Sequence, residues 1–228
     1  MSGMSHTEEF VLNGYPAVLV IPDRPNGKWI WKTEFFYAFD AAERALLEKG
    51  YTRVYYQISD QYGSPDAVSL MRAFQEHVVR QYRLADRAIL FGFSRGGLYA
   101  FNYALRFPEC VEKIYLDAPV LDLRDWPPAG SPEQEQMFKA YRINRASFEH
   151  FSDSPVDRLD AFFQNEIPLL LIAGCRDETV SFSRNAGRLL SYCERRNILV
   201  RYYLKPEGGH HPHSLDDVSP VVRFVTEP

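Results

Sequence analysis

Two spacings of apolar residues recur along this chain. Short runs of apolar, β-branched and aromatic residues indicate strands, and segments with an apolar residue every three or four positions indicate helices. The strands that we predict cover residues 10–12, 17–21, 51–58, 88–93, 111–116, 168–173 and 198–204. The helices that we predict cover residues 33–50, 65–82, 98–107, 183–196 and 214–224. Strand and helix therefore alternate over most of the chain.

This alternation predicts a mostly parallel sheet. A strand, a helix and a second strand in succession need a crossover connection, which makes the two strands parallel. Residues 88–93 and 168–174 are apolar throughout, as is typical of strands buried on both faces. Near the N-terminus, Asn13-Gly14 favours a hairpin instead, because both residues tolerate positive φ. We expect an α/β fold with helices on both faces of the sheet.

One polar stretch interrupts the alternation. Residues 122–160 are rich in Pro, Ser and charged residues and contain no run typical of a core strand. We interpret this stretch as a short cap insertion over the strand ends, with short helices of its own. A length of 228 residues fits one α/β domain. We therefore expect a single domain over residues 1–228 that carries this insertion.

Composition limits the classes of partner. Hydrophobic residues make up 46% of the chain and charged residues 25%, which suits a globular protein with a sizeable core. A net charge of −4 argues against a nucleic-acid or membrane-binding surface.

Cys110, Cys175 and Cys193 form no Cys-x-x-Cys pair, and neither a signal peptide nor a membrane-length apolar run is present. The expectation is a cytoplasmic protein; the pattern indicates no oligomeric state.

A nucleophile motif lies between a predicted strand and a predicted helix. Gly92-Phe93-Ser94-Arg95-Gly96 matches Gly-x-Ser-x-Gly in the context of a nucleophile elbow. There the glycines leave room for a tight turn that exposes the serine Oγ at the carboxyl edge of the sheet. The alternative is a glycine-rich turn whose serine only caps the helix. We expect Ser94 to be the nucleophile, with the backbone N–H of Arg95 as an oxyanion donor.

A serine nucleophile needs a carboxylate and a histidine, which in this kind of fold follow it in that order. Asp177 comes directly after the strand at 168–173 and is the expected acid. Glu178 is the neighbouring alternative, and Asp117 would serve if the acid had moved to the preceding strand. Each of these carboxylates has a simpler interpretation as a solvated loop charge or a helix cap.

The base is expected in the glycine-rich loop after the last predicted strand. Gly208-Gly209-His210-His211-Pro212-His213 offers three histidines, of which we favour His210 as the base and His211 as the second choice, since a flexible glycine pair can bring His210 over the serine. We expect no metal, because an extended His-His-x-His run places alternate side chains on opposite sides and no His-Glu-x-x-His helix accompanies it. No cofactor is expected.

Together, residues 92–96, Asp177 and His210 resemble the catalytic triad of the α/β-hydrolase superfamily. A closer resemblance is to bacterial α/β-hydrolases, some attached to carbohydrate-esterase or prolyl-oligopeptidase-like groups, with a Gly-Lys-Pro-Trp-Val-Trp-Arg-like loop, a Gly-x-Ser-Arg-Gly-Gly elbow and a Gly-His-His-Pro-His box. The corresponding stretches here are residues 27–32, 92–97 and 209–213. The resemblance implies an α/β-hydrolase fold and a serine hydrolase that cleaves a carboxylic ester through an acyl-enzyme.

The same resemblance implies a substrate and further site residues. A small-molecule ester is expected, with a short acyl group such as acetyl on a carbohydrate as the leading candidate. A serine peptidase of the prolyl oligopeptidase type and a non-catalytic binding protein are the alternatives. The superfamily's His-Gly-Gly-Gly oxyanion sequence is absent, so residues 27–31 become the substitute, with Trp29 or Ile30 as the second donor. These residues have a simpler interpretation as core packing. The guanidinium of Arg95 is implied to help bind the oxyanion.

Overall fold

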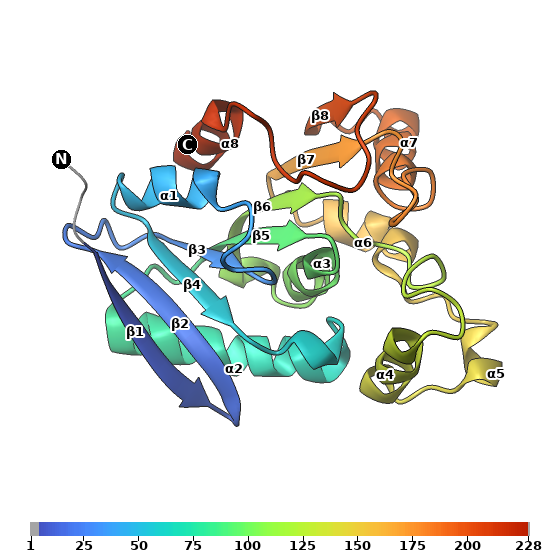
Figure 1. Cartoon of the computed structure of the whole chain (residues 1–228), viewed down its shortest axis with the longest axis horizontal. Coiled ribbons are helices and arrows are strands. Elements are labelled where there is room, and N and C mark those ends of the chain that lie inside the picture. Colours follow the sequence, from blue (N-terminus) through green and yellow to red (C-terminus); the bar gives the residue numbers. More distant parts are fainter. Residues whose placement is uncertain (1–4, 228) are drawn as a thin grey trace.

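The fold is built on one sheet of eight strands in the order β1-β2-β4-β3-β5-β6-β7-β8 (Figure 1). The computed structural model describes residues 5–227. The strands are β1 (Ser5–Leu12), β2 (Tyr15–Pro22), β3 (Trp29–Lys32), β4 (Thr52–Tyr56), β5 (Ala88–Phe93), β6 (Val111–Asp117), β7 (Leu169–Gly174) and β8 (Arg201–Lys205). Strands β3 to β8 are mutually parallel. At one edge of the sheet, β2 runs antiparallel to both of its neighbours, β4 and β1. The predicted mostly parallel sheet is confirmed.

Helices cover both faces of this sheet. They are α1 (Ala41–Leu47), α2 (Pro65–Tyr82), α3 (Gly96–Arg106), α4 (Pro132–Tyr141), α5 (Arg145–Phe148), α6 (Leu159–Phe163), α7 (Ala186–Arg196) and α8 (Ser219–Thr226), with short 3₁₀ turns η1 (Ser59–Gln61), η2 (Pro108–Cys110) and η3 (Pro155–Asp157). Helices α1 and α8 lie on one face, and α2, α3, α6 and α7 lie on the other (Figure 1). No helix within residues 5–227 has both the length and the apolar character needed to cross a membrane.

The position of β5 inside the sheet, covered on both faces, explains why its sequence is apolar throughout. Ile89, Phe91 and Phe93 contribute to the core under α1 and α8, whereas Ala88 and Leu90 contribute to the core on the opposite face. Successive side chains of a strand point to opposite faces, so a strand covered on both faces buries every position. The carboxyl end of β5 is therefore a fixed point, held from both sides, from which the next turn starts.

The hairpin between β1 and β2 forms as predicted. Asn13 has φ of 51° and Gly14 has φ of 83°. Positive φ at both central residues is the geometry of the two-residue turn that matches the twist of an antiparallel pair. The register pairs Leu12 with Tyr15 directly across this turn.

The helix predicted over residues 33–50 is wrong in its first half. The chain forms strand β3 up to Lys32 and then a loop, and only Ala41–Leu47 is helical. Thr33 Oγ1 donates to the carbonyl oxygens of Phe91 in β5 and of Gly96 at the start of α3, which holds the chain beside the sheet. Phe35 and Phe39 have φ of 56° and 51°, and a right-handed helix does not accommodate these values. Gly50, with φ of 91°, lies just beyond the helix.

The stretch at 122–160 contains α4, α5 and η3 and, like the rest of the described chain between β6 and β7, no strand. Helices α4 and α5 lie beyond the carboxyl ends of the parallel strands (Figure 1). Met137 and Phe138 of α4 pack with Tyr62 and Leu98. The Tyr62 hydroxyl also donates to Gln136 Oε1 at 3.0 Å. This stretch is thus attached to the same edge of the sheet at which β5 ends.

Candidate active site

Ser94 occupies the turn between β5 and α3 in a left-handed backbone conformation, with φ of 49°. A non-glycine residue adopts this conformation only when its surroundings enforce it. Here the Ser94 N–H donates to the carbonyl oxygen of Asp117 at 2.9 Å. A Cβ at Gly92 would lie 2.9 Å from Ala100 Cβ, and one at Gly96 would lie 2.8 Å from Thr33 Oγ1. The two glycines of the motif are therefore required by close packing.

His210 lies between Ser94 and Asp177. Its Nε2 is 2.9 Å from Ser94 Oγ, and its Nδ1 is 2.7 Å from Asp177 Oδ2. All three side chains are buried. Because a carboxylate only accepts hydrogen bonds, Nδ1 carries the proton, and in neutral His210 Nε2 is free to accept from the serine hydroxyl. The structure brings the three predicted residues into one hydrogen-bonded chain.

Asp177 is itself held in place. Its Oδ1 accepts from the N–H groups of Thr179 and Val180 at 3.0 and 2.9 Å. One carboxylate oxygen thus closes the turn after β7 while the other faces His210. The neighbouring alternative, Glu178, is exposed.

The loop that carries His210 packs tightly rather than moving freely. A Cβ at Gly174, the end of β7, would lie 2.3 Å from Gly209 O and 2.4 Å from Gly208 O. The Arg176 N–H donates to Gly208 O at 2.9 Å. Glycine at 174 therefore lets the loop after β8 cross the end of β7, and this close crossing places His210 beside Ser94.

Asp117, the other alternative for the acid, pairs with a different histidine. Its Oδ1 is 2.8 Å from His213 Nδ1, and its Oδ2 accepts from the Ser214 N–H at 2.8 Å and the Tyr115 hydroxyl at 2.6 Å. Asp117 is fully buried. Residues 5–227 therefore contain two aspartate–histidine pairs, of which the one with His210 contacts the Ser94 hydroxyl.

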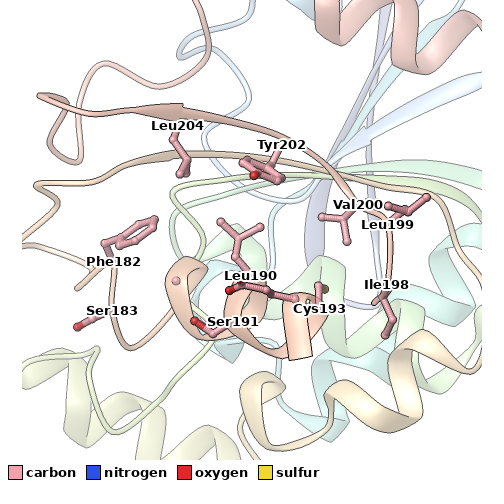
Figure 2. Close-up of a pocket in the computed structure, with 12 residues that line it drawn as sticks. Phe182, Ser183, Leu190, Ser191, Cys193, Ile198, Leu199, Val200, Tyr202 and Leu204 are labelled. Atoms are coloured by element: carbon pink, nitrogen blue, oxygen red, sulfur yellow. The ribbon is translucent and has the colours of Figure 1, made fainter. Parts of the chain in front are cut away.

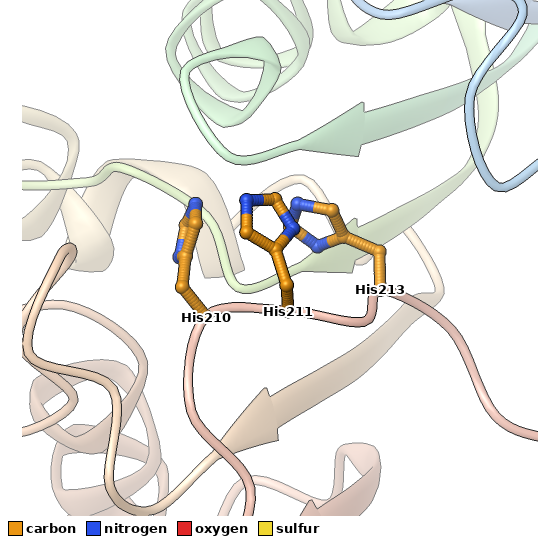
Figure 3. A group of neighbouring side chains, drawn as sticks. All are labelled: His210, His211 and His213. Carbon is orange, nitrogen blue, oxygen red and sulfur yellow. The ribbon is translucent and has the colours of Figure 1, made fainter.

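The three histidines of this loop lie together, contrary to expectation (Figure 3). The ring centroids of His210, His211 and His213 are 4.8 to 5.0 Å apart. Side chains alternate in direction only along extended backbone, and this segment bends at His210, Pro212 and Ser214. His211 is exposed. Its pKa is lowered, mainly by desolvation and secondly by the charges of the nearby imidazoles of His213 and His210.

The predicted oxyanion residues divide into two groups. Trp29 and Ile30 lie within β3, paired to β4 and β5, and are buried in the core. The Trp29 indole donates to Ala85 O at 2.8 Å. The loop predicted at 27–31 is thus a strand from residue 29 on. The chain reaches the elbow only after β3, where Glu34 N would lie 3.4 Å from a Cβ at Gly96.

Arg95 directly follows Ser94 and is the N-cap residue of α3, and its guanidinium is paired. Its Nη2 lies 3.3 Å from Glu34 Oε2, which also accepts from Ser59 Oγ at 3.0 Å. Desolvation raises the pKa of Glu34, and the Arg95 charge offsets part of that rise. Sequence reasoning missed Glu34. The signal that would have found it is the Trp-Ile-Trp-Lys strand, since the residues after a parallel strand lie at the site edge of the sheet.

A groove of about 620 Å³ lies elsewhere, between α7 and β8 (Figure 2). Its walls are mainly apolar, including Phe182, Leu190, Leu199 and Tyr202. The described residues that line it do not include Ser94 or its two partners. The candidate active site is therefore the strand-end cluster and not this groove.

Residues 48–227 match the family model of the prolyl oligopeptidase family. This range contains Ser94, Asp177 and His210. No curated protein matches the chain in sequence.

Solved structures of low sequence identity share the fold. A puromycin-hydrolysing peptidase of Mycobacterium tuberculosis matches 97% of this chain and 37% of its own, with a TM-score of 0.70 and 15% identity. The acylaminoacyl peptidase of Pyrococcus horikoshii matches 92% of this chain and 38% of its own, with a TM-score of 0.66 and 14% identity. The chain thus spans little more than a third of either peptidase.

A third structure is similar over its whole length. The fluorophosphonate-binding serine hydrolase F of Staphylococcus aureus matches 99% of this chain and 96% of its own, with a TM-score of 0.72 and 12% identity. Together with the strand order, these likenesses show that the chain has the α/β-hydrolase fold.

Proposed function

The chain belongs to the prolyl oligopeptidase family, and from this membership we propose that it is a serine hydrolase whose nucleophile is Ser94. The observation that carries the proposal is the continuous hydrogen-bonded chain from Ser94 Oγ through His210 to Asp177. A serine hydroxyl becomes a useful nucleophile when a base is within hydrogen-bond reach and a third group fixes the orientation of that base. Both conditions are met here.

The mechanism follows from the atoms in contact. Ser94 Oγ attacks a substrate carbonyl carbon while His210 Nε2 takes the hydroxyl proton. Asp177 keeps Nδ1 protonated and stabilises the imidazolium. His210 then gives its proton to the leaving group, which leaves an acyl-enzyme. Water, deprotonated by His210, attacks the acyl carbon, and His210 returns that proton to Ser94 Oγ as the acid is released.

The oxyanion is stabilised by backbone N–H groups at the elbow. The Ser94 N–H is already committed to Asp117 O, so the first donor in this proposal is Arg95 N at the start of α3. The second donor comes from the loop after β3, at Glu34 or Phe35, in place of Trp29 or Ile30. Removing one such donor typically costs about 10²–10³ in kcat.

The leading substrate class is a peptide or other amide. Support comes from the family and from the similar Mycobacterium tuberculosis structure, which is described as a puromycin-hydrolysing peptidase. A short-acyl ester on a carbohydrate is the second candidate. Its support is the resemblance of residues 92–97 and 209–213 to esterase motifs.

Labelling with a fluorophosphonate probe tests the nucleophile. The wild-type protein is expected to be labelled, and Ser94→Ala and His210→Ala are expected to lose labelling. His150→Ala, which removes an exposed histidine, is the matched control and is expected to keep it. A folded wild-type protein that resists the probe would overturn the proposal in favour of a non-catalytic binding protein.

Matched substrates then distinguish a peptidase from a carbohydrate esterase. An activated serine cleaves p-nitrophenyl esters in either case, so the informative substrate is the p-nitroanilide with the same acyl group. Turnover of the anilide supports a peptidase. Turnover of acetylated sugars, with an inert anilide, supports the esterase.

A further inference from the structure

The loop between β8 and α8 holds a second arrangement besides the contact with Ser94. His210, His211 and His213 each present a ring nitrogen, and the three nitrogens lie within 4.8 Å of one another. The rings stand side by side on one side of the loop (Figure 3). Imidazole nitrogen is a favoured ligand of Zn²⁺, Cu²⁺ and Ni²⁺.

Buried carboxylates orient two of these rings. His210 Nδ1 faces Asp177 at 2.7 Å, and His213 Nδ1 faces Asp117 at 2.8 Å. Metal-binding histidines commonly give one N–H to a carboxylate, which fixes the tautomer and leaves the other nitrogen free for the metal. Both aspartates are buried, so the rings are held in the form that binds a cation.

His211 completes the set from the solvent side. Its side chain is exposed, whereas those of His210 and His213 are buried. Tetrahedral zinc with bonds of about 2.0–2.1 Å needs ligand nitrogens roughly 3.4 Å apart. The three nitrogens are thus near ligand spacing, and the exposed ring is the one with room to close the remaining gap.

We propose that His210, His211 and His213 form an inhibitory site for a divalent transition cation of the zinc type. The cation takes the His210 Nε2 lone pair, which otherwise accepts the hydrogen bond from Ser94 Oγ. While the cation is bound, Ser94 has no base. A water molecule or Ser94 Oγ supplies the fourth ligand, as in zinc sites with three protein ligands. The inhibitory consequence rests on the proposed function, but the binding of the cation does not.

Calorimetric titration with Zn²⁺ alone tests the site. The wild-type protein and Ser94→Ala are both expected to bind one zinc ion per chain. His211→Gln is expected to bind at least about tenfold more weakly, because it loses one of three ligands. His150→Gln is the matched control, an exposed histidine outside the cluster, and is expected to bind as the wild type does. Equal affinity in His211→Gln and His150→Gln, or no binding to the wild type, would overturn the proposal.

Labelling by the fluorophosphonate probe in zinc buffers tests the inhibition. The wild-type labelling rate is expected to fall over the same zinc concentrations as the calorimetric binding and to return when a chelator is added. His211→Gln, scaled to its own zinc-free rate, is expected to need at least tenfold more zinc. Zinc binding without any change in labelling would overturn the inhibitory role. If the wild type is not labelled at all, the proposed function fails while the calorimetry still decides the site.

Discussion

Asp117 Oδ1 lies 2.8 Å from His213 Nδ1, and this contact repeats the one between Asp177 and His210 in the same loop. Two adjacent parallel strands, β6 and β7, each deliver one of these carboxylates at the carboxyl edge of the sheet. Among the described residues, only the His210 pair contacts the Ser94 hydroxyl. The two pairs therefore predict different consequences when each aspartate is replaced.

Asp177→Asn is expected to lower kcat by about 10⁴-fold with little loss of stability. An amide at this position is able to donate to His210 Nδ1, which would leave the proton on Nε2 and block acceptance from Ser94. The measurement is kcat for a p-nitrophenyl ester, with thermal unfolding as the control. A loss of less than about tenfold would mean that Asp177 does not set the tautomer.

Asp117→Asn is expected to act mainly on stability. The fully buried carboxylate accepts from His213, the Ser214 N–H and the Tyr115 hydroxyl, and the amide replaces one acceptor oxygen with a donor. Leaving buried partners unpaired costs about 2–5 kcal/mol. Urea unfolding measures the free energy of unfolding. An unchanged midpoint would show that the loop does not depend on this pair, and a kcat loss larger than that of Asp177→Asn would contradict the division of roles.

Gly174→Ala is expected to displace the loop that carries His210. The new Cβ would meet two backbone carbonyl oxygens at 2.3 and 2.4 Å, and neither can rotate away as a side chain would. A stability loss of about 1–3 kcal/mol is expected, together with slower probe labelling. Gly209→Ala is the matched comparison, because its Cβ would have no contact closer than 3.8 Å. Equal effects of the two variants would show that the crossing at Gly174 does not position His210.

The buried ion pair of Lys32 and Glu43 makes a prediction about stability. Lys32 Nζ lies 2.6 Å from Glu43 Oε1, and both side chains are almost fully buried. Desolvation lowers the pKa of Lys32 and raises that of Glu43. Glu43→Leu is expected to cost about 3–5 kcal/mol, because it leaves a buried charge, whereas the double variant Lys32→Met, Glu43→Leu is expected to recover most of that loss. Additive losses in urea unfolding would contradict a coupled pair.

The same single variant has a defined pH dependence. Without Glu43, the pKa of Lys32 in the folded state falls further below its unfolded value of 10.5. A group with a depressed folded pKa contributes stability above the unfolded pKa and loses it as the pH falls through the folded pKa. The stability of Glu43→Leu relative to the wild type is therefore expected to rise as the pH is raised toward 10.5. A flat difference across that range would count against a buried, charged lysine.

The spacing of apolar residues predicted the elements that can be recognised from neighbouring positions in the sequence. The helix at Pro65–Tyr82 and the strand at Ala88–Phe93 were found at their bounds, because amphipathic spacing and an unbroken apolar run need no distant partner to be recognised. The order of parallel strands then placed Ser94, Asp177 and His210 at one edge of the sheet, since each follows the carboxyl end of a strand.

The features that the sequence did not predict depend on contacts between residues distant in the chain. Trp29–Lys32 is too short to stand out, and it is a strand because β4 and β5 pair with it on both sides. Phe35 and Phe39 take positive φ, which no helical spacing of apolar residues reveals. The clustering of the three histidines depends on bends after β8. Each of these features is decided by packing against segments distant in sequence.

The contact between Ser94 and His210 spans 116 residues of chain. A ribosome adding about 5–20 residues per second completes the nucleophile elbow roughly 6–23 s before it adds the base. During that interval the emerging polypeptide holds a serine hydroxyl with the weak reactivity of any other alcohol. The order of synthesis therefore leaves Ser94 without its base, and so a poor nucleophile toward any acyl group, until most of the sheet has been synthesised.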